Sequence, residues 1–378
     1  MSSTIASLAQ YHLLGRTGLR VSPLALGTMT FGTEWGWGSP AETVHRILAR
    51  YLEAGGNFID TADSYTNGTS ETLIGDFFAR NGGRDRAVIA TKFTINAWTR
   101  SAEAAKGGLG DPNAGGNGRK NIYRALEASL RRLKTDYVDL YWLHAWDGLT
   151  PVEEVVSTLH RLVQDGKIRH YGFSDVPAWY FARAQTLAER GGLERVAALQ
   201  LEYSLVERNI EREHIPALLE LGSALTAWSP LASGMLSGKY VRQGVKAQGD
   251  GRLGTAAATT SPVFSRLLTE RNWTIVEALI AVAKEVGRSP AQVALNWIAR
   301  RPGMAAAIIG ASKLEQLEDN LHALDFTLPK PLSDKLEAVS RPETIHPYHF
   351  FKDPFFTRGL FSGGNIVRAE PIGFRAPE

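Results

Sequence analysis

Short apolar runs and longer amphipathic stretches alternate along most of this 378-residue chain. The apolar runs have the length of buried strands, and a helical pattern follows each of them. Strands separated by helices pair in parallel through right-handed crossovers, and eight such units fit a (β/α)8 TIM barrel. The eight strand candidates are residues 23–26, 58–60, 88–92, 138–144, 168–174, 198–202, 225–228 and 306–309.

An N-terminal β-hairpin is expected before the first of these strands, because residues 11–14 and 19–21 flank a Gly-Arg-Thr-Gly turn. The main alternative fold is a doubly wound sheet, which would carry G-x-G-x-x-G after its first strand to bind a dinucleotide. Residues 27–32 read Gly-Thr-Met-Thr-Phe-Gly and do not match. Ser70, followed by Glu71, is typical of a helix start after the second strand. We expect a single domain over residues 1–378, with the barrel core at about 11–328 and an aromatic-rich tail at 341–378.

Composition excludes several classes of protein. The chain has no cysteine, which excludes disulfides, thiolate nucleophiles and cysteine-bound metals. The net charge is only +3 and the basic residues are dispersed, so no basic stripe favours nucleic acid. No apolar run reaches membrane-spanning length, and residues 1–10 lack the charged leader and apolar core of a secretory signal. We therefore expect a cytoplasmic protein whose partner is a small molecule, with no nucleic acid or membrane and with a homo-oligomer as one option.

Reactive polar side chains gather where three consecutive strands end. Asp60 ends the second strand and Tyr65 follows in its loop, Lys92 ends the third strand, and His144 ends the fourth. Barrel enzymes carry their active sites on the face where these carboxyl ends meet. An ammonium beside a phenol lowers the phenol pKa, and a buried carboxylate keeps that ammonium charged. Asp60, Lys92 and Tyr65 would thus form a tuned proton donor, and a neutral His144 would orient a carbonyl oxygen.

This set of four residues suits protonation of a carbonyl oxygen while hydride reaches the carbonyl carbon. No side chain supplies hydride, so a redox cofactor is required. Taken singly, each residue has a simpler interpretation: Asp60 as a cap, Lys92 as a solvated strand end, His144 as a satisfied interior residue and Tyr65 as a packed aromatic. Their joint spacing favours function, because four independent coincidences would otherwise be needed.

Longer motifs around these residues resemble the aldo-keto reductase family. They begin with Gly-Asn-Phe-Ile-Asp-Thr-Ala-Asp-Ser-Tyr at 56–65, Thr-Lys at 91–92 and Asp-Leu-Tyr-Trp-Leu-His at 139–144. Gly-Phe-Ser-Asp at 172–175, Gln-Leu-Glu-Tyr-Ser at 200–204, Trp-Ser-Pro-Leu-Ala-Ser-Gly at 228–234 and Gly-Ala-Ser at 310–312 follow in the family's order. The resemblance implies a barrel that binds a nicotinamide dinucleotide across its C-terminal face. It also implies that Tyr65 is the general acid, tuned by Lys92 and Asp60, and that His144 positions the carbonyl.

The resemblance further implies the cofactor contacts. Ser174, Asp175 and Gln200 match the positions that hold the carboxamide, and Trp228 matches the aromatic that stacks on the nicotinamide. The contacts at strand ends, along the pyrophosphate and around the adenosine end are Thr28, Met29, Asp60, Ser229, Pro230, Leu231, Ser233, Lys239, Gly310, Ser312, Gln316, Asp319 and Asn320.

Two departures from the family pattern bear on this cofactor. Asp175 stands where many relatives carry Asn, and a carboxylate can accept from the carboxamide NH2 but cannot donate to its oxygen. Gly310 and Ser312 stand where some relatives place a basic residue on the 2′-phosphate. Relatives with a similar Gly-Ala-Ser still favour NADP, so we expect NADP, with NAD as the alternative.

Loops on the same face supply the candidate substrate contacts. Trp35, Trp37, Trp98 and Trp146 follow the first, third and fourth strands, and with Tyr65 they would line a site for an apolar, aromatic or polycyclic substrate. The loops at 96–117 and 243–260 are long enough to be working lids or disordered segments. We expect the tail aromatics to pack on the barrel, with a pocket or subunit contact as the alternative.

The resulting hypothesis is an NADP-dependent oxidoreductase that interconverts a carbonyl and an alcohol. One rival is a cofactor-binding regulatory subunit, since potassium-channel β subunits resemble the same family. The retention of all four residues at the strand ends favours catalysis. A second rival is a metal-dependent hydrolase built on His144 and Asp147, which lacks a second His–carboxylate cluster at a strand end.

Overall fold

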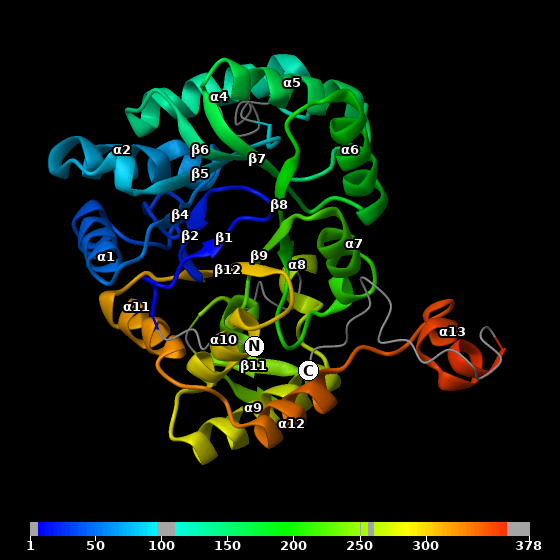
Figure 1. Ribbon diagram of the computed structural model, residues 1–378. Coiled ribbons are helices and arrows are strands. Elements are labelled where there is room, and N and C mark those ends of the chain that lie inside the picture. The colour runs from blue at the N-terminus through cyan, green and yellow to red at the C-terminus, as the bar shows by residue number, and fades with distance from the viewer. Residues whose placement is uncertain (1–6, 97–109, 250, 256–260, 361–378) are drawn as a thin grey trace.

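A closed barrel of eight parallel strands forms the centre of the protein (Figure 1). The computed structural model describes residues 7–96, 110–249, 251–255 and 261–360. Neighbouring strands run in the order β12-β3-β4-β5-β6-β7-β8-β9, which confirms the predicted (β/α)8 fold. Their bounds are β3 Leu24–Gly27, β4 Phe58–Asp60, β5 Val88–Phe93, β6 Val138–Leu143, β7 Ile168–Ser174, β8 Val196–Glu202, β9 Ala224–Trp228 and β12 Met304–Gly310.

Amphipathic helices surround the barrel and bury their apolar faces against the outside of the strands (Figure 1). The helices between successive strands are α1 Ala41–Glu53, α2 Thr69–Asn81, α4 Arg119–Leu133, α5 Val152–Gln164, α6 Ala178–Gly191 and α7 His214–Leu221, followed by the short α8 Pro262–Ser265, α9 Glu270–Val286 and α10 Pro290–Ala299. After β12 come α11 Leu314–Leu321 and α12 Lys330–Ser340. None of the helices in the described part of the chain is both long and apolar enough to cross a membrane.

The interior of the barrel is filled by a second, smaller apolar core. Its largest member is Trp142 on β6, which is fully buried. Gly172 on the neighbouring strand makes room for it, because a Cβ at Gly172 would lie 2.2 Å from the Trp142 ring. The barrel is therefore a packed core rather than a channel, as expected for this fold.

The predicted N-terminal hairpin closes one end of the barrel. Strands β1 (His12–Leu13) and β2 (Arg20–Val21) are antiparallel, and Leu14 and Val21 are fully buried within the inner core. A ring nitrogen of His12 lies 2.9 Å from the carbonyl oxygen of Ala305 at the start of β12. The amino-terminal end of the barrel is thus covered, and the carboxyl ends of the strands form the open face.

The first part of the loop expected at 243–260 is regular, which the sequence did not predict. Residues 241–248 form an antiparallel hairpin of β10 Val241–Gln243 and β11 Lys246–Gln248. Arg242 forms ion pairs with Glu270 and Glu277 of α9, and the Trp273 indole N–H donates to the carbonyl of Val245 at 2.9 Å. These contacts fix the hairpin to α9. The other long loop, at 96–117, lies mostly outside the described residues.

The tail aromatics pack on one another rather than on the barrel. Phe350 and Phe356 have ring centroids 4.6 Å apart, whereas Phe351 and Phe355 are exposed. Helix α13 (Tyr348–Lys352) stands to one side of the barrel in Figure 1. The hydroxyl of Tyr348 donates to Glu213 and links this segment to the body. The expectation of close packing on the barrel is therefore wrong for these residues, while Phe361 lies outside the described residues.

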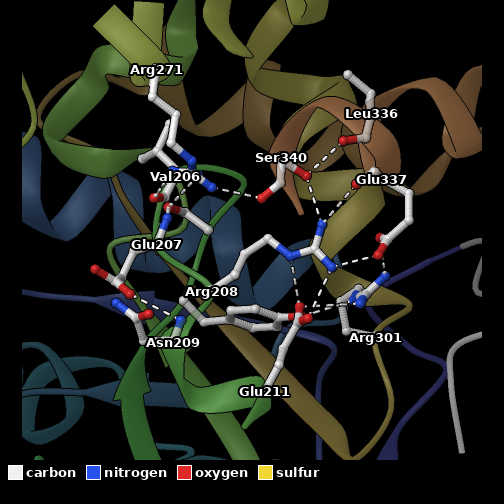
Figure 2. Close-up of polar contacts among 12 residues, drawn as sticks. Val206, Glu207, Arg208, Asn209, Glu211, Arg271, Arg301, Leu336, Glu337 and Ser340 are labelled. Atoms are coloured by element: carbon white, nitrogen blue, oxygen red, sulfur yellow. Dashed lines mark hydrogen bonds and ion pairs between the residues drawn. The ribbon is translucent and has the colours of Figure 1, made fainter. Parts of the chain in front are cut away.

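A largely buried cluster of charges connects the loop after β8 to the segment after α10 and to α12 (Figure 2). The side chain of Arg208 is 1% exposed and bonds both carboxylate oxygens of Glu211, at 2.8 and 2.9 Å, and Glu337 of α12 at 2.5 Å. Arg301 bonds the same two glutamates at 3.2 and 3.0 Å. Burial alone would raise the pKa of Glu211, but Arg208 and Arg301 hold that pKa below its usual value. Two positive and two negative side chains thus balance one another inside the protein.

Candidate active site

Strained backbone conformations gather at the open face of the barrel. Apart from Lys134, which closes α4, the non-glycine residues with positive φ in the described chain lie in loops after β4, β5, β7 and β9. They are Thr66, Asn67, Thr94, Asp175, Ser229, Ala232 and Ser233. Such conformations cluster at functional sites. The backbone therefore marks the face on which barrel enzymes carry their active sites.

Lys92 links Asp60 and Tyr65 at the centre of this face. Its ammonium is fully buried and donates to Asp60 Oδ2 at 2.5 Å, to the carbonyl of Thr61 at 2.7 Å and to the Tyr65 hydroxyl at 3.1 Å. The register of the sheet creates this contact, because Asp60 of β4 pairs with Ala90 of β5, two residues before Lys92. The structure thus brings together three residues that the sequence places on separate strand ends and loops.

Burial dominates the acid–base behaviour of this group. It raises the pKa of the Tyr65 phenol above its usual value, and the charge of Lys92 offsets this only in part, because Asp60 acts in the opposite direction. The predicted net lowering of the phenol pKa is therefore wrong for this structure. Burial would lower the pKa of Lys92, but Asp60 and Tyr65 outweigh it and raise that pKa. At neutral pH Lys92 is charged and Tyr65 carries its proton, which is the state that a proton donor needs.

His144 lies beside Tyr65, directly after β6. The two rings meet edge to face with centroids 6.1 Å apart. The backbone N–H of His144 donates to the carbonyl of Phe93 at 3.3 Å and to the Thr94 hydroxyl at 3.2 Å, which holds this strand end against β5. Because the two rings are neighbours, one small group can contact both the imidazole and the phenol.

The residues expected to hold a carboxamide lie next to this group and are connected to it. Gln200 donates from Nε2 to Asp60 Oδ1 at 2.9 Å, so its amide oxygen is the group that can accept from a ligand. The indole N–H of Trp228 donates to Asp175 Oδ1 at 3.1 Å, and the Ser174 hydroxyl donates to Asp175 Oδ2 at 3.3 Å. Asp175 reaches solvent at the open face, yet protein surrounds it on its other sides, and this burial raises the pKa of Asp175 to about 6.

The segment after β9 contains two cationic side chains, Lys239 and Arg252, close to a tight turn. The 3-10 turn η5 (Ala232–Ser237) contains Gly234, and a Cβ there would lie 3.4 Å from the Lys239 ammonium. Arg252 follows the β10–β11 hairpin, and its guanidinium lies 5.2 Å from the centroid of the Trp37 ring. Burial lowers the pKa of Arg252, and among the described residues no carboxylate pairs with it. Since β12 lies between β9 and β3, the contact between Arg252 and Trp37 spans the end of β12.

The residues expected at the adenosine end lie around the β12–α11 loop. Gln316 Oε1 accepts from the backbone N–H and the hydroxyl of Ser312 at 2.9 and 3.1 Å. Asn320 donates to the carbonyl of Gly310 at 3.3 Å, while a side chain at Gly310 would meet open space. The carboxylate of Asp319 is engaged elsewhere, because it accepts from two residues at the start of α10 at 3.0 and 2.7 Å. In this structure Asp319 holds α11 against α10.

The remaining expected cofactor contacts differ in how they are held. Thr28 is fully buried, donates to the carbonyl of Asp60 at 3.1 Å and accepts from the Ser70 hydroxyl at 2.8 Å. Met29 is half-buried in the next position. The Ser229 hydroxyl accepts from the N–H of Ser233 at 3.3 Å, within the turn that also contains Pro230 and Leu231. Thr28 therefore supports the strand ends from below the open face.

Two of the tryptophans expected around a substrate form a pair in the β3–α1 loop. Trp35 and Trp37 have ring centroids 5.3 Å apart, and Trp37 also meets Arg252. Trp98 lies outside the described residues. The pair borders the segment that crosses the end of β12.

A second aromatic group stands beyond His144. Trp146 packs edge to face on Trp179 with centroids 5.6 Å apart and also contacts Tyr180. The backbone N–H of Trp146 donates to the carbonyl of Asp175 at 3.3 Å, which places this group beside the residues expected to hold a carboxamide. Trp146 and Trp179 are 39% and 56% exposed, so both present apolar surface on this side of the protein.

Sequence reasoning did not single out Trp179 or Arg252. Trp179 comes five residues after the end of β7, in the first turn of α6. This short distance from a strand end could have indicated a position near the open face. Arg252 lies among glycines in a loop of no recognisable pattern, and only the fold brings it to Trp37. Among the described residues, no group of three His, Cys, Asp or Glu side chains is placed to hold a metal ion.

Comparisons with known proteins agree with this geometry. The model of the Aldo/keto reductase family matches residues 23–341. The uncharacterized oxidoreductase YrpG of Bacillus subtilis is 36% identical over 340 residues, covering 87% of this chain and 95% of the relative. The aryl-alcohol dehydrogenase (NADP(+)) of Phanerodontia chrysosporium is 33% identical, covering 89% of this chain and 87% of the relative. A probable voltage-gated potassium channel subunit beta of Oryza sativa subsp. japonica is 36% identical, covering 90% of this chain and 99% of the relative. The chain therefore belongs to the aldo/keto reductase family.

Proposed function

We propose that this protein is an NADP(H)-dependent oxidoreductase that reduces aromatic aldehydes or ketones to alcohols. The observation that carries the proposal is the Lys92 ammonium, which bonds the Asp60 carboxylate and the Tyr65 hydroxyl at once, beside His144. This arrangement holds a protonated phenol at an open face next to an imidazole. It is suited to proton transfer and has no activated nucleophile.

Each residue of this group has a part in the proposed reaction. Tyr65 donates its proton to the carbonyl oxygen, and the charge of Lys92 stabilises the phenolate that remains. Asp60 keeps Lys92 charged and in place. His144 donates a hydrogen bond to the same oxygen and orients the carbonyl. A reduced nicotinamide bound beside these residues would supply the hydride for the carbonyl carbon, and the products would be the alcohol and NADP+.

The residues of the open face fit a nicotinamide dinucleotide. Trp228 is half-buried and held at its edge by Asp175, so it offers a fixed flat surface for the nicotinamide ring. The amide oxygen of Gln200 would accept from the carboxamide. Lys239 and Arg252, the latter buried and with no carboxylate partner in the described chain, would hold the phosphates. NADP is favoured over NAD because the aryl-alcohol dehydrogenase relative carries NADP(+) in its name.

Aromatic carbonyl compounds are the substrate class that the neighbouring side chains favour. Trp146 and Trp179 expose ring faces and edges beside the residues that would hold the nicotinamide. Flat apolar molecules gain both burial and ring–ring contacts on such surfaces. The aryl-alcohol dehydrogenase among the relatives agrees with this choice.

The test is oxidation of NADPH, followed by its absorbance, with matched aromatic and aliphatic aldehydes and ketones. We expect turnover with NADPH and a higher kcat/KM for the aromatic member of each pair. Equal values within each pair would contradict the substrate class, and the absence of turnover with every compound would contradict the reductase.

A regulatory, cofactor-binding subunit is the second candidate, favoured by the rice potassium channel subunit beta among the relatives. It predicts tight NADPH binding with turnover too slow to be the main activity. Steady-state rates over the same panel distinguish the two candidates.

Replacing Arg252 with alanine should weaken the binding of NADPH and NADP+ equally. Bonds to charged groups are worth about 1.5–3 kcal/mol, so we expect Kd to rise by about tenfold or more for both nucleotides. Arg242→Ala is the matched control, because Arg242 lies on the preceding hairpin but pairs with Glu270 and Glu277. Calorimetric titration measures both constants, and an unchanged Kd would remove Arg252 from the phosphate site.

A further inference from the structure

Among the described residues, Asp175 has no cationic partner, and it lies at the nicotinamide end of the proposed cofactor site. Within the described chain its oxygens accept from two neutral donors, the Trp228 indole and the Ser174 hydroxyl. Neutral donors leave the negative charge of a carboxylate in place. At any pH where Asp175 is ionised, it therefore adds one negative charge to this edge of the site.

Two other acidic groups near this site, among the described residues, are each bonded to a cation. Asp60 pairs with the buried Lys92 at 2.5 Å. Glu202 is the last residue of β8, where it pairs with Trp228 of β9, and Arg266 donates to both of its carboxylate oxygens at 2.7 Å. Asp175 is therefore the carboxylate beside Trp228 that no cation of the described chain bonds, and its charge contributes directly to the potential there.

The bond to Trp228 sets where this charge acts. The carboxylate lies at the edge of the indole, 3.1 Å from its nitrogen. Stacked aromatic rings have centroids about 4.5–7 Å apart, so a ring on Trp228 would lie within a few ångströms of Asp175. At such distances two unit charges interact strongly enough to change an equilibrium tenfold, even at an effective dielectric constant of about 20.

We propose that the carboxylate of Asp175 makes this site selective for the oxidised cofactor and so favours carbonyl reduction on the enzyme. The inference rests on the proposed function, since it assumes that the nicotinamide lies on Trp228. The oxidised nicotinamide ring carries a positive charge and the reduced ring is neutral, so the carboxylate attracts only the oxidised form. Loss of hydride creates that positive charge, and Asp175 stabilises it. The phosphate groups have the same charge in both forms, so Lys239 and Arg252 do not discriminate between them.

The variant Asp175→Asn removes the negative charge of the side chain and keeps nearly the same size and shape. An asparagine oxygen can still accept from the Trp228 indole, and asparagine tolerates the positive φ of 47° at this position. The backbone N–H of residue 175 continues to donate to the carbonyl of Gln200, at 3.2 Å in the structure. We therefore expect the variant to fold and to keep its aromatic surface.

The experiment is calorimetric titration of both proteins with NADP+ and with NADPH at pH 8 and low salt, where Asp175 is ionised. In Asp175→Asn we expect the ratio Kd(NADP+)/Kd(NADPH) to rise about tenfold, with most of the change in NADP+. Arg252→Ala is the control, in which both constants rise and their ratio stays the same. An unchanged ratio in Asp175→Asn, with both nucleotides still bound, overturns this inference alone. Failure of the wild-type protein to bind either nucleotide overturns the proposed function as well.

Discussion

Tyr65→Phe is expected to lower kcat for carbonyl reduction by about 10²–10⁴-fold, the range that a positioned proton donor contributes. The hydroxyl of Tyr65 bonds Lys92 at 3.1 Å, and no other phenol in the described chain does so. Without that hydroxyl, the carbonyl oxygen must take its proton from water while hydride arrives. The ring itself remains, so the packing against His144 and the binding of NADPH should be unchanged. Single-turnover oxidation of bound NADPH measures this step directly.

Tyr137→Phe is the matched control for this variant. Tyr137 precedes β6 at the opposite end of the barrel, and its hydroxyl donates to Asp85 at 3.0 Å. Its removal should leave the rate of carbonyl reduction at the wild-type value. If Tyr65→Phe retains that rate as well, the phenol is not the proton donor, and the catalytic proposal fails even though the family assignment stands.

Arg208→Met is expected to destabilise the protein by about 3–5 kcal/mol, the usual effect of removing one member of a buried ion pair. Arg208 bonds Glu211 and Glu337 in the cluster of Figure 2. The substitution leaves two partly buried carboxylates, each 21% exposed, with only Arg301 to balance them. Thermal unfolding should show a fall in Tm on the order of 10 °C.

Arg183→Met provides the comparison, because Arg183 also pairs with a glutamate but lies on the surface, with 55% of its side chain exposed. Exposed pairs contribute little, so this variant should unfold close to the wild-type temperature. Equal Tm values for the two variants would mean that the buried cluster does not stabilise the fold.

The same cluster predicts a response to acid. The pKa of Glu211 is lowered in the folded protein, so its contribution to stability is fully present above the pKa of the unfolded chain, about 4.3. That contribution is lost as the pH falls through the lower, folded value. Wild-type stability should therefore drop below about pH 4, and in Arg208→Met this part of the drop should be smaller.

Local sequence patterns were sufficient to predict the barrel and the link between Asp60, Lys92 and Tyr65. Strand periodicity places Asp60 and Lys92 at the ends of neighbouring strands, and parallel register then brings them together. The hydrogen-bond partner of the Ser70 hydroxyl could not be predicted from local patterns. The hydroxyl was expected to cap α2, but it bonds Thr28, because the packing of the helix on β3 offers a partner that the local sequence cannot reveal.

Features made by distant segments could not be predicted from the sequence. Arg208 and Glu337 are far apart in the chain, and neither lies in a recognisable motif. The β10–β11 hairpin turns at Gly244 and Val245, a weaker signal than Asn-Gly, and its contacts with α9 come from a distant segment. The rise in the pKa of Tyr65 could not be predicted for a related reason, because the effect of burial depends on everything packed around the phenol.

The N-terminal hairpin covers the amino-terminal end of the barrel and so restricts the routes by which ligands can reach the proposed site. With Leu14 and Val21 buried in the inner core, the proposed nucleotide and its substrate would both bind from the opposite end of the barrel. On Trp228 the nicotinamide would lie beneath the substrate, so the nucleotide has to arrive first and leave last. Kinetics should then be sequential and ordered, with NADP+ competing against NADPH and the alcohol product competing against neither.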